Sequence, residues 1–245
     1  MDDIEFKPIF TLKEIDKKTL KLLKKSNLLR PLIKNSIIDN LTKDIKFTKA
    51  EINDEIGKFY ANNSINNSIE LNRYLDHYGI TEEDLQYQIL LPNRILELSK
   101  QMFQNRIDAH FLKRKESLDK YTYNILRLDN IDLAYELFFQ LQEKESDFAK
   151  LSFEHSIDSN IFPNGIAGPR SLDGTHPTIV ELLRNSTPGV LNEPIKIERW
   201  WLIIKLIERN QATLDLHNTK LMFLELFNIF IEEKINLALR EEFIN

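Results

Sequence analysis

The sequence has no cysteine among its 245 residues, and it has only 6 glycines and 8 prolines. The lack of cysteine excludes a disulfide framework, a thiolate nucleophile and a metal site with cysteine ligands. Because helix-favouring Leu, Ile, Lys and Glu dominate instead, we expect long helices with few sharp turns. The histidines show no metal-site spacing, so we expect no metal and no cofactor; they are His77, His110, His155, His176 and His217.

Positive charge is also in short supply, since the net charge is −5. Residues 1–50 carry 12 Lys and Arg against 7 Asp and Glu, so the remainder of the chain is strongly acidic. This balance argues against a nucleic-acid binder. No apolar run is long enough for a signal peptide or a stable membrane insertion, which predicts a cytoplasmic protein, with a periplasmic one as the alternative.

Apolar residues at three- and four-residue spacing predict an all-helical module over residues 1–118. Thr11 with Glu14 and Thr48 with Glu51 have the spacing of a capping box, which begins a helix. Gly79 is placed to end one. Pro92 is expected to kink or divide the helix that contains it.

The pattern changes at about residue 119. Two runs rich in aromatic and β-branched or aliphatic residues, 121–128 and 200–207, predict strands. Helices are expected between them, and 159–174, with three glycines and two prolines, reads as loop. Residues 119–210 therefore predict a small α/β domain with an antiparallel sheet. The helix expected over 211–245 is apolar nearly all round, so we predict that it packs on the N-terminal module, giving an α+β protein.

Three segments of the predicted α/β domain carry a recognisable order: 146–152 (SDFAKLS), 155–158 (HSID) and 164–168 (NGIAG). They resemble the core of the parvulin-type prolyl isomerases, in which a Phe-Ala helix precedes a Ser-x-Asp turn and a glycine loop. The segment 186–189 and the strand at 200–206 continue this resemblance, which covers about residues 120–210.

The flanking helices extend the resemblance to SurA-type and PrsA-type foldases, which join a helical module to a parvulin domain. Residues 165–169, His176-Pro177 and Trp200-Trp201 are similar to a cyanobacterial branch of these foldases that generally lacks an evident signal peptide. This resemblance implies unfolded or proline-containing polypeptides as partners; the oligomeric state stays open.

The resemblance also places the family's catalytic positions on this chain. The first histidine becomes Asn124, and the second becomes Leu202 or Trp201. The proline pocket falls on Thr175 and Ile179, with Ala167, Pro169 and Trp201 as further substrate-binding positions, and Pro169 stands where many relatives have Trp. Only Asp158 keeps the family's residue type.

Prolyl isomerisation needs rotation about an X-Pro amide with a barrier of about 20 kcal/mol, and no obligatory proton transfer. Catalysis means binding the twisted amide better than either planar isomer. Asn124 could still donate a hydrogen bond. The absence of both histidines, and of the phenylalanine that lines the proline pocket in the family, nevertheless predicts weak or absent activity.

Asp158 could instead only cap a turn, as Asp commonly does. The glycines at 165–168 lack the strand-to-helix setting of a phosphate-binding loop. The first functional hypothesis is a chaperone that holds unfolded polypeptide in an apolar groove between module and domain. The alternatives are an active isomerase with an atypical site and an accessory factor for peptide maturation or export.

Overall fold

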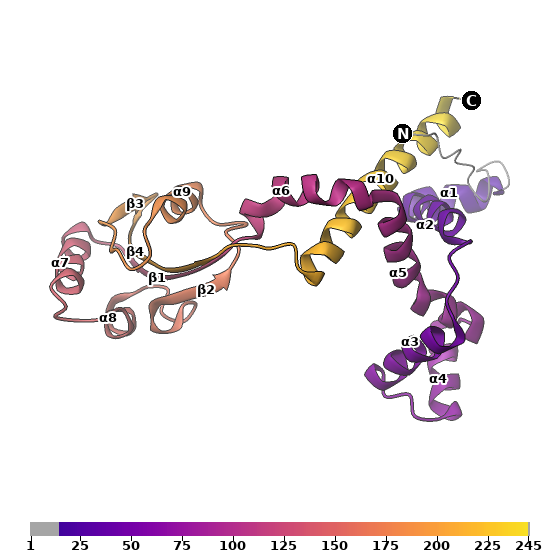
Figure 1. The fold of residues 1–245 in the computed structure, drawn as a ribbon, viewed down its shortest axis with the longest axis horizontal. Helices are drawn as coiled ribbons and strands as arrows, with labels where there is room; N and C mark the ends of the chain where they lie inside the picture. The colour runs from indigo at the N-terminus through magenta and orange to yellow at the C-terminus, as the bar shows by residue number, and fades with distance from the viewer. Residues whose placement is uncertain (1–14, 245) are drawn as a thin grey trace. The chain divides into compact units, whose positions relative to one another are not determined.

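The computed structural model describes residues 15–244 and divides the chain into two compact units. Residues up to His110 and from Asp215 onward form one, here the helical unit; Phe111–Leu214 form the other, here the sheet unit. Figure 1 shows helices throughout the first and a β-sheet in the second. This sheet has four strands, and each neighbouring pair is antiparallel. The predicted α+β class is therefore confirmed.

The helical unit consists of consecutive helices joined by short turns. Its elements are α1 (Lys17–Lys25), α2 (Leu29–Thr42), α3 (Lys49–Asn62), α4 (Ser68–Tyr78), α5 (Glu82–Phe103), the 3₁₀ turn η2 (Gln104–Arg106) and α10 (Leu216–Ile244). The helix α6 (Ile107–Leu118) contains the boundary between the units.

Several of these helices begin or end at capping residues that the sequence predicts. Thr48 and Glu51 form both hydrogen bonds of a capping box at α3, and Gly79 ends α4 in the left-handed conformation (φ 63°) that favours glycine. The predicted pair Thr11 and Glu14 lies outside the described residues. Asp16 caps α1, where its carboxylate accepts from the backbone N–H groups of Lys18 and Thr19.

The helix α10 packs against α2 and α5 (Figure 1). Met222, Phe227, Ile231 and Ile235 on α10 are all at most 2% exposed. Arg30 on α2 forms an ion pair with Glu232 on α10. Since apolar side chains cover most of its circumference, α10 completes a core that the N-terminal helices leave open.

Pro92 does not divide the helix, because α5 runs from Glu82 to Phe103 with Pro92 inside it. The helix changes to 3₁₀ geometry at Gln104 instead. Proline removes one helical hydrogen bond, and the burial of Leu85, Leu90 and Phe103 along α5 outweighs that local loss.

The sheet unit has strand order β2-β1-β4-β3, with every neighbouring pair antiparallel. Its elements are β1 (Lys120–Leu128), α7 (Ile131–Gln142), α8 (Phe148–His155), the 3₁₀ turn η3 (Pro163–Gly165), β2 (Ile166–Arg170), α9 (Pro177–Asn185), β3 (Ile195–Ile197) and β4 (Trp200–Asn210). The central strands β1 and β4 are the two that the sequence predicts. The edge strand β2 lies inside the predicted loop 159–174, so that part of the loop assignment is wrong.

Two separate apolar cores lie on the two faces of this sheet. Tyr121, Tyr123 and Ile125 of β1 pack toward α9, whereas Leu126 and Leu128 pack toward α7 and α8. This division follows from the two-residue period of a strand. We call these the α9 face and the α7/α8 face.

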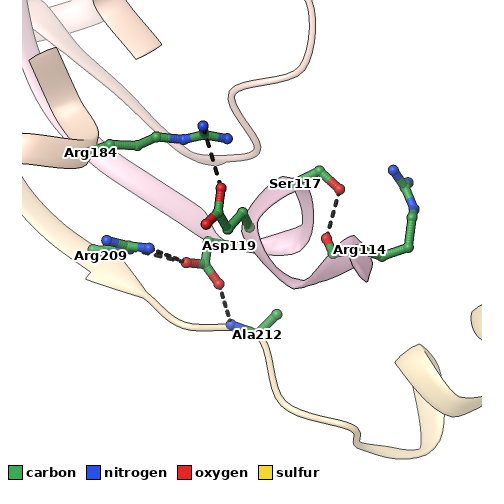
Figure 2. Close-up of polar contacts among 7 residues, drawn as sticks. Arg114, Ser117, Asp119, Arg184, Arg209 and Ala212 are labelled. Carbon is green, nitrogen blue, oxygen red and sulfur yellow. Dashed lines mark hydrogen bonds and ion pairs between the residues drawn. The ribbon is translucent and has the colours of Figure 1, made fainter. Parts of the chain in front are cut away.

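A buried carboxylate joins the two chain ends of the sheet unit (Figure 2). Asp119, 1% exposed, accepts hydrogen bonds from Arg209 Nε at 3.0 Å and Nη2 at 2.8 Å, and from the Ala212 N–H at 2.8 Å. These contacts connect the residue before β1 with the end of β4 and the segment after it. We call this group the Asp119 clasp.

Candidate functional site

Three of the predicted site residues come together on the α9 face. Ile179 on α9, Leu202 on β4 and Ala167 on β2 are 7%, 1% and 2% exposed, and all belong to one apolar cluster with Tyr123. Tyr123 is itself 2% exposed, and burial raises the pKa of its hydroxyl. This cluster is closed core in the described structure, with no imidazole among its members.

Asn124 and Trp201 lie on the α7/α8 face, so they are not brought together with Ile179 and Leu202. Trp201 packs against the core of that face, and Asn124 borders a cavity there. The Asn124 Nδ2 donates to the Gly165 carbonyl at 3.3 Å. Asn124 on β1 pairs with Lys205 on β4, whereas Trp201 on β4 pairs with Leu128 on β1. Asn124 and Trp201 are therefore also separated along the strand direction.

Asp158 is buried, at 6% exposure, in the turn after α8, and it pairs with Arg127 on β1. The Arg127 Nε lies 3.0 Å from one carboxylate oxygen, and its Nη1 donates to the other at 3.3 Å. The Asp158 carbonyl accepts from the N–H groups of Ile161 and Phe162, both at 2.9 Å. The backbone of Asp158 thus forms the turn, while its side chain holds an arginine.

The remaining predicted positions lie in the segments around α9 and β2. Pro169 on the edge strand β2 is exposed, and Thr175 is half-buried just before α9. Gly168 precedes Pro169 with φ 109°, and a Cβ there would lie 2.2 Å from the Tyr121 carbonyl oxygen. This glycine is therefore required for β2 to approach β1, which gives the glycine loop a structural role.

Sequence reasoning missed Tyr123 and Arg127. Both lie on β1 at odd-numbered positions, with Tyr121 and Ile125, and Tyr123 reaches the same core as Ile179 and Leu202. The alternation of β1 carries this signal, because a strand that buries Tyr121 on one face must turn Asn124 to the other.

A cavity of about 600 Å³ lies on the α7/α8 face. Strands β1, β2 and β4 supply Asn124, Ile166 and Lys205, and the segment from the end of α7 into α8 supplies Lys144 and Phe148. Its size falls within the range of small-ligand and peptide sites. We call it the Asn124 groove.

A second recess of about 460 Å³ lies in the helical unit, between α4 and the turn before it. Tyr74 and Tyr78 line it, and their ring centroids are 4.6 Å apart. Phe59 on α3 contacts Tyr74 edge to face at 5.6 Å. Neither α3 nor α4 has a fully buried residue. In this aromatic hairpin, formed by Phe59, Tyr74 and Tyr78, Tyr78 is exposed and the other two rings are half-buried.

Residues 15–244 contain no group of three or more His, Asp or Glu side chains arranged to hold a metal ion. Among the helices in that range, none combines the length and apolarity that a membrane crossing requires.

No family model matches the chain, and no curated protein matches it. Solved structures with similarity to it include the peptidylprolyl isomerase PrsA of Bacillus anthracis, at 17% identity and TM-score 0.42, over 87% of this chain and 96% of that one. The foldase PrsA of Streptococcus pneumoniae matches at 17% and 0.45, over 98% and 95%. A SurA-like chaperone of Campylobacter jejuni matches at 17% and 0.38, over 94% and 85%.

Proposed function

We propose that this protein is a folding factor that binds unfolded polypeptide and has weak or no prolyl isomerase activity. The observation that carries the proposal is the closed α9 face. The parvulin resemblance assigns the proline pocket to Thr175 and Ile179 and the second histidine to Leu202 or Trp201. Of these, Ile179 and Leu202 are buried in one cluster with Tyr123. With no open apolar slot and no imidazole at those positions, little preference for a twisted amide is expected.

Binding of polypeptide is supported by a surface of the helical unit. The aromatic hairpin carries Phe59, Tyr74 and Tyr78 on helices without fully buried residues. Tyr78 is 58% exposed and Ile69 on the same helix is 70% exposed. Exposed apolar groups gathered around a recess are typical of interaction surfaces.

The proposal is tested by suppression of aggregation of a chemically denatured client protein. Tyr74→Ser with Tyr78→Ser should reduce suppression several-fold, because these rings supply the apolar contact. The matched control is Tyr135→Ser with Phe139→Ser, which removes another exposed aromatic pair four residues apart, on α7. Equal loss in both double variants, or no suppression by the unmodified protein, would contradict the proposal.

An active isomerase with an atypical site is the second candidate, and the buried Asp158–Arg127 pair favours it. We expect little acceleration of X-Pro isomerisation in a short peptide or in the refolding of a proline-limited protein. Substantial turnover in both assays that Asp158→Ala abolishes would establish this candidate instead. Turnover that Asp158→Ala leaves unchanged would point to another part of the chain.

The expected compartment and the cyanobacterial branch stay predictions. Fractionation of the source cells, with detection of the native protein, distinguishes the expected cytoplasmic location from a periplasmic one. A role in maturation or export of one dedicated peptide would use the same binding surfaces. Identification of polypeptides crosslinked to the protein in cells would separate one partner from many.

A further inference from the structure

We propose that the Asn124 groove binds a polypeptide segment through a carboxylate, with an apolar side chain of the segment seated beside it. The proposal rests on the polypeptide-binding function argued above and names the ligand chemistry of one surface. The groove lies on the α7/α8 face, and its lining includes Asn124 but not Ile179, Leu202 or Ala167, which belong to the α9 face.

The positive charge of the groove favours binding of an anion. Lys205 on β4 is half-buried at the groove, and Lys144 lies at its rim after α7. Within the described residues neither lysine has an ion pair or side-chain hydrogen bond. Asp147, the one carboxylate in the lining, accepts from the Lys150 N–H at 2.9 Å as the cap of α8. A half-buried ammonium group without an acidic partner is stabilised when a ligand supplies one.

Polar groups in the groove suit a peptide backbone. Asn124 uses one N–H for the Gly165 carbonyl, which leaves its other N–H and its oxygen for a ligand. The Ser146 Oγ is buried in the lining and has no hydrogen-bond partner in the described structure. An amide and a hydroxyl can together satisfy the donor and the acceptor of a peptide unit.

The apolar residues in the lining indicate that the ligand also carries an apolar side chain. The apolar lining consists of Leu141, Phe148, Leu191 and Ile166, of which Ile166 is 42% exposed. An apolar side chain next to a carboxylate occurs at the C-terminal residue of a polypeptide, or where Asp or Glu adjoins an apolar residue. Both sources present the same chemistry to Lys205.

The test uses the full chain and isothermal titration with three short peptides. The first is acetyl-Gly-Ala-Phe-Leu with a free carboxylate, the second is the same peptide amidated, and the third is amidated acetyl-Gly-Glu-Phe-Leu. Binding of the first peptide should weaken about tenfold on amidation, the expected loss of one charge-assisted hydrogen bond. Recovery of affinity by the third would assign the site to acidic side chains, and no recovery would assign it to chain termini.

Lys205→Gln should reproduce the tenfold loss for the free peptide and remove the effect of amidation. Lys120→Gln is the control, since Lys120 is an exposed lysine of β1 that does not line the groove. Equal binding of free and amidated peptides, or unchanged binding by the Lys205→Gln variant, would overturn the inference. If either result is obtained while the protein still suppresses aggregation, the inference about the groove fails and the proposed function stands. If the protein binds the carboxylate but does not suppress aggregation, the proposed function fails instead.

Discussion

At the scale of residues, the Asp119 clasp is a buried polar group that connects the two chain ends of the sheet unit. Its two carboxylate oxygens accept three hydrogen bonds at 1% exposure. The bond to Asp119 raises the pKa of Arg209, so the guanidinium keeps its charge there. Close to Asp119 in sequence, Glu116 forms a longer ion pair of 3.4 Å with Arg184.

Asp119→Asn should destabilise the sheet unit by about 2 kcal/mol, because it leaves Arg209 without its anion. The value is below the range for fully buried pairs, since the Arg209 side chain is 33% exposed. Urea unfolding followed by tryptophan fluorescence measures this unit specifically, because the only tryptophans are Trp200 and Trp201. The control is Asp129→Asn, an exposed loop residue; an equal effect there would contradict the prediction.

The candidate site shows where residue-level prediction stops. Family resemblance placed Asn124 at a histidine position, yet strand alternation turns it away from Ile179. A shift of one position in a strand changes the face of every side chain, and resemblance in short segments does not fix the register so finely. Asp158 could be singled out from its motif, but its partner Arg127 required the fold.

At the scale of elements, the capping boxes of α3 and α5 couple helix starts to pH. Hydrogen bonds from Thr48 hold the pKa of Glu51 below its usual value, and Thr81 does the same for Asp84. A lowered folded-state pKa means that the charged form stabilises the helix. That contribution is present above the unfolded-state pKa and is lost as pH falls through the folded-state pKa.

The double variant Glu51→Gln and Asp84→Asn should therefore lose less thermal stability than the unmodified protein between pH 6 and pH 3. Circular dichroism at 222 nm gives the melting temperatures. Glu233→Gln with Asp76→Asn, two exposed carboxylates of the same unit, is the control. An acid sensitivity that is identical in the capping variant and the unmodified protein would show that the caps contribute nothing measurable.

Packing of α10 gives a second prediction at this scale. Ile231 is 0% exposed, so Ile231→Ala should cost about 3 kcal/mol through lost burial and the cavity it leaves. Ile229, 49% exposed on the same helix, is the matched control, and Ile229→Ala should change stability by less than about 0.5 kcal/mol. Urea unfolding monitored by helical circular dichroism checks both. Similar costs at the two positions would mean that α10 is not anchored by this face.

The elements also separate what sequence pattern predicts from what it misses. The central strands β1 and β4 are long, with 9 and 11 residues, and buried side chains mark them clearly. The edge strands β2 and β3 have 5 and 3 residues, and β2 contains glycine and proline. Edge strands need few ladder bonds and tolerate such residues, so their pairing depends on a neighbour that local pattern does not reveal.

At the scale of the whole molecule, the sheet unit is an insertion whose two ends meet. Lys120 pairs with Asn210 across β1 and β4. Replacement of residues 120–210 by a short Gly-Ser linker should therefore leave the helical unit folded, because the linker spans a small distance. We expect this variant to keep part of the aggregation suppression. Complete loss with an intact helical circular dichroism spectrum would assign polypeptide binding to the sheet unit alone.

The docking of α10 on α2 also sets an order for folding during synthesis. The contact between Arg30 and Glu232 joins residues separated by 202 positions, so the helical unit stays incomplete until α10 has left the ribosome. The sheet unit, a continuous segment from Phe111 to Leu214, has no such delay. The apolar faces of α2 and α5 that contact α10 therefore stay exposed to solvent until α10 is synthesised. In this respect the nascent chain resembles the unfolded polypeptides proposed as its partners.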